Sequence, residues 1–226
     1  MTESGITLAI ESSTYLASCA LFAGDEPEPI ASAEVPTRGA TGELLLPAID
    51  AIVRRSGVAY GDLSRVMCGA GPGSFTSLRV GASIAKGLAH GSGAALFAVP
   101  SLVLLVVSGA EPREPGAYLA VVDAMRGERF VQGVRIAGDG RLTMLGGPRR
   151  VGTDAVREEA SRLAARTIGP GEGVEIHASP HARGALRLPA ELLEAADLDS
   201  WEPHYGRLAE AQVKWEAAHG RPLGAA

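Results

Sequence analysis

The residues best suited to chemistry form a glycine-rich segment, Gly69–Thr76, expected between a strand and a helix. Glycines let the backbone approach a ligand closely, and the free amides at the start of a helix can bind an anion such as phosphate. The segment lacks the Gly-Lys-Ser/Thr ending of a P-loop and the spacing of dinucleotide-binding loops, so both classes are excluded. A tight turn in which Ser74 or Thr76 caps the helix explains the same residues without a ligand, and we favour it.

Neither a catalytic nucleophile nor a metal site is recognisable in the sequence. Ser74 lacks the Gly-x-Ser-x-Gly context of a hydrolase nucleophile. Only His177 and His181 have the i, i+4 spacing of helical metal ligands, but Pro180 between them argues against a shared helix, and we interpret both as surface histidines. We therefore predict no catalytic residue, no metal site and no cofactor.

Apolar runs and turn signals place the glycine-rich segment in an α/β fold. Ile6–Ile10 and Leu16–Phe22 predict a hairpin around a hydroxyl-rich turn, and strands at Arg65–Cys68 and Ala95–Val99 flank a helix over Ser77–His90, which implies parallel pairing. Further expected elements are a strand at Ile30–Val35, a helix carrying Leu45, Ile49 and Ile52 on one face, a helix from Ser101, strands at Tyr118–Val122 and Arg129–Ile136, and helices at Thr153–Arg166, Ala190–Ala195 and Gly206–His219.

A proline-rich connector at Glu111–Gly116 predicts a domain boundary. We expect an N-terminal α/β domain over residues 1–110 and a second, less regular α/β domain over residues 111–205. The amphipathic helix expected at 206–219 should pack back on the first domain.

Composition narrows the class of protein. With 226 residues, 46% of them hydrophobic, the chain can bury a substantial core, and a net charge of −5 provides no broad basic surface for RNA. Cys19 and Cys68 lie in apolar runs and are expected to be reduced, buried thiols. Neither a signal peptide nor a membrane span of about 20 residues is recognisable, so we expect a cytoplasmic protein without membrane contact.

Four segments together resemble the bacterial TsaB-type family. Gly71–Gly81 is close to the family signature, and Ala9–Thr14, Glu43–Pro47 and Asp123–Glu128 also match. The resemblance implies an actin-like, sugar-kinase-like (ASKHA) fold of two related α/β domains with a degenerate nucleotide site facing the cleft between them. The residues carried over to that site are Glu11, Ser12, Ser13, Gly71, Gly73 and Ser74. Glu11 stands where the family usually has Asp, and Ser77 where it has Gly, which favours degeneracy.

The resemblance also implies a function: a non-catalytic dimerization subunit that pairs with a catalytic sister subunit of the same fold. Aided by a small ATPase subunit, that pair transfers a threonylcarbamoyl group to the adenosine next to the anticodon of tRNA, so this chain would meet tRNA only through the complex. The helix after Gly42 is apolar over more than one stripe, which indicates either deep burial or a partner surface. Expected interface residues are Leu45, Ile49, Ile52, Leu78, Ala82 and Ala85.

Three alternatives remain open from the sequence. The six expected interface residues could form ordinary domain core, and the same surface could support a homodimer. The chain could also be an enzyme by itself, either a peptidase or a phosphotransferase. A phosphotransferase would need Gly169–Gly173 as a second phosphate loop, although Glu172 would repel phosphate and a plain surface turn explains that segment.

Overall fold

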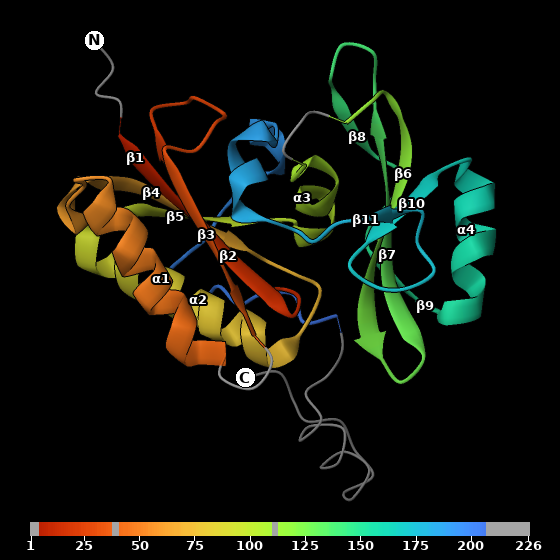
Figure 1. Ribbon diagram of the computed structural model, residues 1–226, viewed down its shortest axis with the longest axis horizontal. Coiled ribbons are helices and arrows are strands. Elements are labelled where there is room, and N and C mark those ends of the chain that lie inside the picture. Colours follow the sequence, from red (N-terminus) through yellow and green to blue (C-terminus); the bar gives the residue numbers. More distant parts are fainter. Residues whose placement is uncertain (1–4, 38–40, 110–112, 207–226) are drawn as a thin grey trace, which may run out of the picture.

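The computed structural model describes residues 5–37, 41–109 and 113–206, which form two lobes, each built on its own β-sheet (Figure 1). The strand order is β12-β5-β4-β1-β2-β3 in the first sheet and β11-β10-β6-β7-β8 in the second, where β9 also pairs with β7. The change of sheet falls between α3 and β6, where the proline-rich connector predicts a boundary.

The elements of the first lobe follow the predicted order closely. They are β1 (Ile6–Glu11), β2 (Leu16–Ala23), β3 (Ala31–Pro36), α1 (Thr41–Arg55), a 3₁₀ turn (Tyr60–Asp62), β4 (Leu63–Gly69), α2 (Phe75–Ser92), β5 (Ala95–Val99) and α3 (Ser101–Val107). The predicted hairpin and the parallel pairing of β4 with β5 are both confirmed. Helix α2 ends at Gly93, whose φ of 73° is the left-handed conformation that glycine favours at a helix C-terminus.

The second lobe contains less helix than the first. It contains β6 (Gly116–Met125), β7 (Glu128–Ile136), β8 (Leu142–Met144), β9 (Arg149–Gly152), a 3₁₀ turn (Thr153–Ala155), α4 (Val156–Leu163), β10 (Arg166–Gly169) and β11 (Ile176–His177). The chain then returns to the first lobe through the 3₁₀ segments η3 (Ala182–Arg187) and η4 (Ala190–Leu192) and the short strand β12 (Glu194–Ala195).

The two lobes share one topology. In the first sheet β1 pairs antiparallel with β2 and parallel with β4, which pairs parallel with β5. In the second, β6 pairs antiparallel with β7 and parallel with β10, which pairs parallel with β11. When β12 of the first sheet and β9 of the second are left aside and the remaining strands are numbered within each lobe, both sheets have the order 3-2-1-4-5. This repeated order confirms the expected fold of two related α/β domains.

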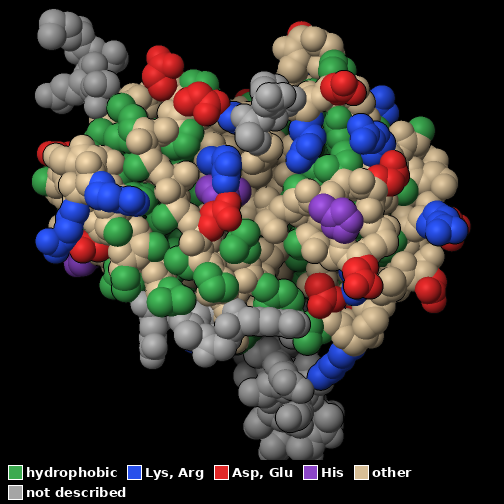
Figure 2. Space-filling model, in the orientation of Figure 1, with side chains coloured by type: hydrophobic (Ala, Val, Ile, Leu, Met, Phe, Trp, Pro, Cys, Tyr) green, Lys and Arg blue, Asp and Glu red, His purple; other side chains and the backbone are tan. Residues whose placement is uncertain are grey.

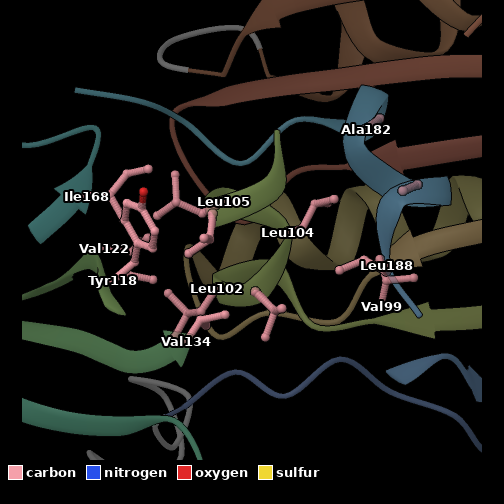
Figure 3. Packing of buried hydrophobic residues seen from close by; sticks show 14 of the residues in the cluster. Val99, Leu102, Leu104, Leu105, Tyr118, Val122, Val134, Ile168, Ala182 and Leu188 are labelled. Atoms are coloured by element: carbon pink, nitrogen blue, oxygen red, sulfur yellow. The ribbon is translucent and has the colours of Figure 1, made fainter. Parts of the chain in front are cut away.

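The elements stack in layers (Figure 1). Helices α1 and α2 cover the outer face of the first sheet, α3 and η3 lie between the sheets, and α4 covers the outer face of the second. Figure 3 shows Leu102 and Leu105 of α3 beside Tyr118 and Val134 of the second sheet. Because α3 is buried on all sides, the lobes share a continuous hydrophobic core.

Two sequence predictions differ from the structure. The helix expected at Ala190–Ala195 is wrong: η4 is a single 3₁₀ turn, and Glu194 then pairs with Ala98 at the edge of the first sheet. Since β12 belongs to that sheet, residues 111–205 do not form one continuous second domain. The helix expected at 206–219 lies almost wholly outside the described residues.

Cysteine chemistry agrees with the sequence analysis. Cys19 and Cys68 are free and buried, and burial raises the pKa of the Cys19 thiol to about 12. Among the helices of the described ranges, none is long and apolar enough to cross a membrane.

Candidate functional site

The glycine-rich loop packs directly against the turn between β1 and β2. The amide of Ser74 donates a hydrogen bond to the carbonyl oxygen of Ser13 at 2.7 Å. A Cβ on Gly73 would lie 2.1 Å from that same oxygen, and a Cβ on Gly81 would lie 2.2 Å from the Ser12 hydroxyl oxygen. Only glycine allows this approach, so loop and turn are fitted to each other rather than held apart.

Glu11, at the end of β1, connects the two segments through hydrogen bonds. Its Oε1 accepts from the Ser13 amide at 2.5 Å, and its Oε2 accepts from the Ser101 hydroxyl at 2.8 Å. The Ser101 oxygen in turn accepts from the Gly71 amide at 3.0 Å. The carboxyl is fully buried, and burial raises its pKa against the opposing effect of the hydrogen bonds from Ser13 and Ser101.

The predicted nucleotide-site residues are thus brought together, but by contacts among themselves. Glu11 points into the protein, where a Cβ on Gly69 would meet its Oε2 at 2.1 Å. Among the described residues, none is hydrogen bonded to the buried hydroxyl oxygens of Ser12 and Ser13. Ser101 is the member of this cluster that the sequence analysis missed, because its contact with Glu11 joins positions far apart in the chain.

A small pocket lies where this cluster faces the second lobe. It has a volume of about 170 Å³ and is lined by the β1–β2 turn, the start of α2, the β6–β7 hairpin and Pro170. At its mouth the Tyr15 hydroxyl donates to Met125 Sδ at 3.2 Å, so the lobes touch across the opening. The turn and the glycine-rich loop therefore face the interdomain cleft.

The second lobe has a counterpart of the glycine-rich loop that is built differently. In the first lobe the loop after β4 leads into α2, whereas in the second lobe residues 170–175 connect β10 to β11 without a helix. A phosphate loop depends on the free amides at a helix N-terminus, and this connection supplies none. Pro170 reaches the cleft pocket, but Glu172 and Gly173 line a different hollow beside α4.

In the part of the chain that the structure describes, the hydroxyl groups of Ser74 and Ser77 are paired with each other and not with a base. Ser74 Oγ and Ser77 Oγ lie 3.0 Å apart, and within the described residues neither is hydrogen bonded to a histidine or a carboxylate. Across residues 5–37, 41–109 and 113–206, no group of three histidine, cysteine, aspartate or glutamate side chains is arranged to hold a metal ion.

His181 is not the surface histidine that the sequence suggested. It is only 4% exposed, its Nδ1 accepts from the Arg183 amide at 2.9 Å, and its Nε2 lies 3.0 Å from Glu34 Oε1. Burial and the nearby Arg183 guanidinium lower the pKa of His181 to about 4, although Glu34 opposes them. The chain folds this side chain inward because η3 packs against β2, a contact that local sequence does not reveal. His177 is exposed, as expected.

The expected interface residues are buried within the chain. Leu45, Ile49, Ile52, Leu78, Ala82 and Ala85 are each at most 6% exposed. Leu45, Ile49 and Ile52 pack with Ala85 in the core beneath α1 and α2, which is the domain-core alternative. On the outer side of these helices, Leu46 of α1 is 46% exposed.

A shallow groove follows that outer side. It has a volume of about 290 Å³ and is lined by Leu46 of α1 and by Arg79, Val80, Ser83 and Ile84 of α2. Figure 2 shows hydrophobic side chains gathered at the lower left of the molecule, in the part of the first lobe that holds α1, and interspersed acidic and basic side chains over the visible face.

Comparison with known proteins identifies a family. The model of the family described as TsaD, tRNA N6-adenosine threonylcarbamoyltransferase, matches residues 39–198. The chain is 34% identical over 123 residues to the tRNA threonylcarbamoyladenosine biosynthesis protein TsaB of Haemophilus influenzae, covering 54% of this chain and 51% of the relative. It is 27% identical over 226 residues to the protein of that name from Bacillus subtilis, covering 92% and 96%. The first of these matches spans about half the length of the relative.

Solved structures show the same fold. A YeaZ structure from Pseudomonas aeruginosa superposes with a TM-score of 0.69 at 21% identity, covering 89% of this chain and 99% of that one. A second structure from the same organism, described as similar to peptidase YeaZ, reaches a TM-score of 0.73 at 23% identity, covering 90% and 100%.

Proposed function

Because the chain belongs to the tRNA N6-adenosine threonylcarbamoyltransferase family and is of the TsaB/YeaZ type, we propose that it is a non-catalytic scaffold subunit in threonylcarbamoyladenosine biosynthesis. It pairs with a catalytic sister subunit of the same fold. With a small ATPase subunit, this pair transfers the threonylcarbamoyl group to the adenosine next to the anticodon, in the cytoplasm. The chain meets tRNA only as part of that complex.

The observation that carries the non-catalytic role is the direct contact between the glycine-rich loop and the β1–β2 turn. The Ser74 amide, which could otherwise serve a phosphate, already donates to Ser13. Glu11, the carboxylate that would meet a hydrated cation, accepts its hydrogen bonds from the protein itself. A nucleotide would have to break these contacts before it could bind, which supports a degenerate site.

The outer side of α1 and α2 is the proposed docking surface for the sister subunit. We move the interface from the six buried residues to the groove lined by Leu46, Arg79, Val80, Ser83 and Ile84. The exposed Leu46 and the half-buried Ile84, next to the small Ser83, offer apolar area to a partner helix and room for close approach. Self-association would use the same surface when the sister subunit is absent.

The first test is reconstitution. The sister subunit, the ATPase subunit and the enzyme that makes the threonylcarbamoyl adenylate are incubated with tRNA, with and without this chain, and modified adenosine is quantified. The proposal expects product only when the chain is present and expects the chain alone to hydrolyse neither ATP nor peptide. Equal product without it, or hydrolysis by the chain alone, would favour a phosphotransferase or peptidase.

The second test locates the surface. Leu46→Asp and Ile84→Asp should each weaken binding to the sister subunit at least tenfold, roughly the effect of one charge placed in an apolar contact. Ile30→Asp is the matched control, because Ile30 is a 50% exposed isoleucine beside β3. Titration calorimetry measures all three, and equal losses from the control and the groove variants would place the interface elsewhere.

A further inference from the structure

The last described residues of the chain, Pro203–Gly206, cross the interdomain cleft over the glycine-rich loop. Pro203 is buried, and the amide of His204 donates to the carbonyl oxygen of Ala70 at 2.8 Å. In Figure 1 this dark-blue segment runs between α2 and the β6–β7 hairpin. We call Pro203–Gly206 the strap.

Two glycines show how closely the strap is fitted. A Cβ on Gly71, in the loop, would lie 2.5 Å from the carbonyl oxygen of His204. Gly206 has a φ of 70°, and a Cβ there would lie 2.4 Å from the ring of Phe130. Phe130 is a 3% exposed residue of β7, so the strap touches the backbone of the first lobe and a buried aromatic ring of the second.

The strap also lies between two hollows of the cleft. Gly73 and Phe130 line the pocket of about 170 Å³ on one side. Gly71 and His204 line a larger hollow of about 610 Å³ on the other. Because the strap contacts Ala70 of the first lobe and Phe130 of the second, it bridges the cleft between them.

A line of side chains connects the strap to the groove on α1 and α2. The ring of Tyr205 lies 4.5 Å from the ring of Phe75, centroid to centroid, at an interplanar angle of 47°. The guanidinium carbon of Arg79 lies 5.5 Å from the centroid of the same Phe75 ring. Arg79 is itself one of the residues that line the groove.

From these contacts we infer that the strap positions the docking surface, with Tyr205 as the positioning residue. Tyr205 stacks on Phe75, Phe75 supports the Arg79 guanidinium, and Arg79 forms one wall of the groove. The strap thereby couples the angle between the lobes to the shape of the surface that receives the sister subunit. This inference rests on the proposed function for the identity of the partner, but the strap contacts can be tested without it.

The strap is tested first in the isolated chain. Gly206→Val would drive a side chain into the Phe130 ring, so we expect amide exchange of residues 69–76 and of His204 to quicken on the order of tenfold. Gly173→Val is the matched control: Gly173 also has a positive φ, 78°, but a Cβ built there has no neighbouring atom of the described residues within 4 Å. Wild-type exchange rates in Gly206→Val would contradict the proposed role of the strap.

Coupling is tested by affinity for the sister subunit. Tyr205→Ala should weaken binding roughly fivefold or more, while Tyr205→Phe, which keeps the stacked ring, should bind as the wild type does. Wild-type affinity in Tyr205→Ala, or an equal loss in Tyr205→Phe, would overturn the positioning role. If Leu46→Asp also binds normally, the proposed docking surface fails separately, and the exchange experiment still decides whether the strap exists.

Discussion

At the scale of single residues, two buried ionisable groups connect segments that lie far apart in the sequence. Glu11 joins the end of β1 to the β1–β2 turn and, through Ser101, to the glycine-rich loop. His181 joins the return segment to β3 through Glu34. Both have pKa values displaced by burial, so each makes the stability of the protein depend on pH in a direction that can be stated.

Replacing Glu11 with glutamine should alter the pH dependence of stability. Burial raises the folded-state pKa of Glu11 above its ordinary value of 4.5, so its neutral form is favoured by folding. Its contribution to stability is complete below pH 4.5 and is lost as pH rises through the folded pKa. Since glutamine does not titrate, the free energy of unfolding of Glu11→Gln, measured with urea, should fall less over that pH interval. Parallel curves for the two proteins would contradict the assignment.

The opposite sign holds for His181. Its pKa falls from 6.5 to about 4 on folding, so the stability it contributes is present above pH 6.5 and is lost as pH falls toward 4. His181→Asn keeps an acceptor for the Arg183 amide without a titrating ring. The midpoint temperature of thermal unfolding should therefore change less between these pH values in the variant than in the wild type. A wild-type slope in the variant would assign the acid sensitivity to another group.

At the scale of elements, the two lobes differ in how their helices end. Helix α2 ends at a glycine, whereas α4 ends at Ala164, which has φ 46° and ψ 45°. This left-handed conformation is unfavourable for alanine because its Cβ crowds the backbone. The helix nevertheless ends there because the Ala165 amide donates to the Ala160 carbonyl and β10 begins directly afterwards.

Ala164→Gly should therefore stabilise the protein by about 1 kcal/mol, the cost of the left-handed conformation for a residue with a Cβ. Glu158→Gly, in the first turn of the same helix, is the control and should destabilise the protein by roughly 0.5–1 kcal/mol. Glycine loses more backbone entropy on folding, and the change removes an acidic side chain from the helix N-terminus. Chemical denaturation measures both changes. Destabilisation by Ala164→Gly would mean that the methyl group contributes packing that outweighs the backbone strain.

At the scale of the whole molecule, α3 joins the two lobes through a shared hydrophobic core. It is buried between the two sheets, and its core cluster draws residues from both, including Met67 and Val134. The strap adds a second connection across the cleft, between the glycine-rich loop and Phe130. A change in α3 should therefore weaken both lobes together.

Leu105→Ala tests this expectation. Leu105 is fully buried, and removing it should lower the free energy of unfolding by about 2–5 kcal/mol and quicken amide exchange in both sheets. Leu119→Ala is the control, because Leu119 is equally buried but packs with α4 on the outer face of the second sheet. Exchange confined to one sheet in Leu105→Ala would show that the lobes unfold independently.

Local patterns in the sequence were sufficient for most elements and for the family. Short apolar runs predicted β1, β2 and β5 within one or two residues, and the glycines at 69–73 predicted the loop before α2. These predictions succeed because a strand, a turn and a close backbone approach depend on residues that are neighbours in the chain. The strand order, repeated in both lobes, follows from the same elements only once their pairing is known.

Only the tertiary structure determined which helix faces are buried in the core and which are exposed. Helix α1 is apolar over more than one stripe, so its sequence cannot tell Leu45, which packs on the first sheet, from Leu46, which faces outward. The burial of His181, the pairing of Glu194 with Ala98 and the stacking of Tyr205 on Phe75 all join segments that the chain brings together only on folding. Such contacts have no period in the sequence, because each depends on where another segment lies.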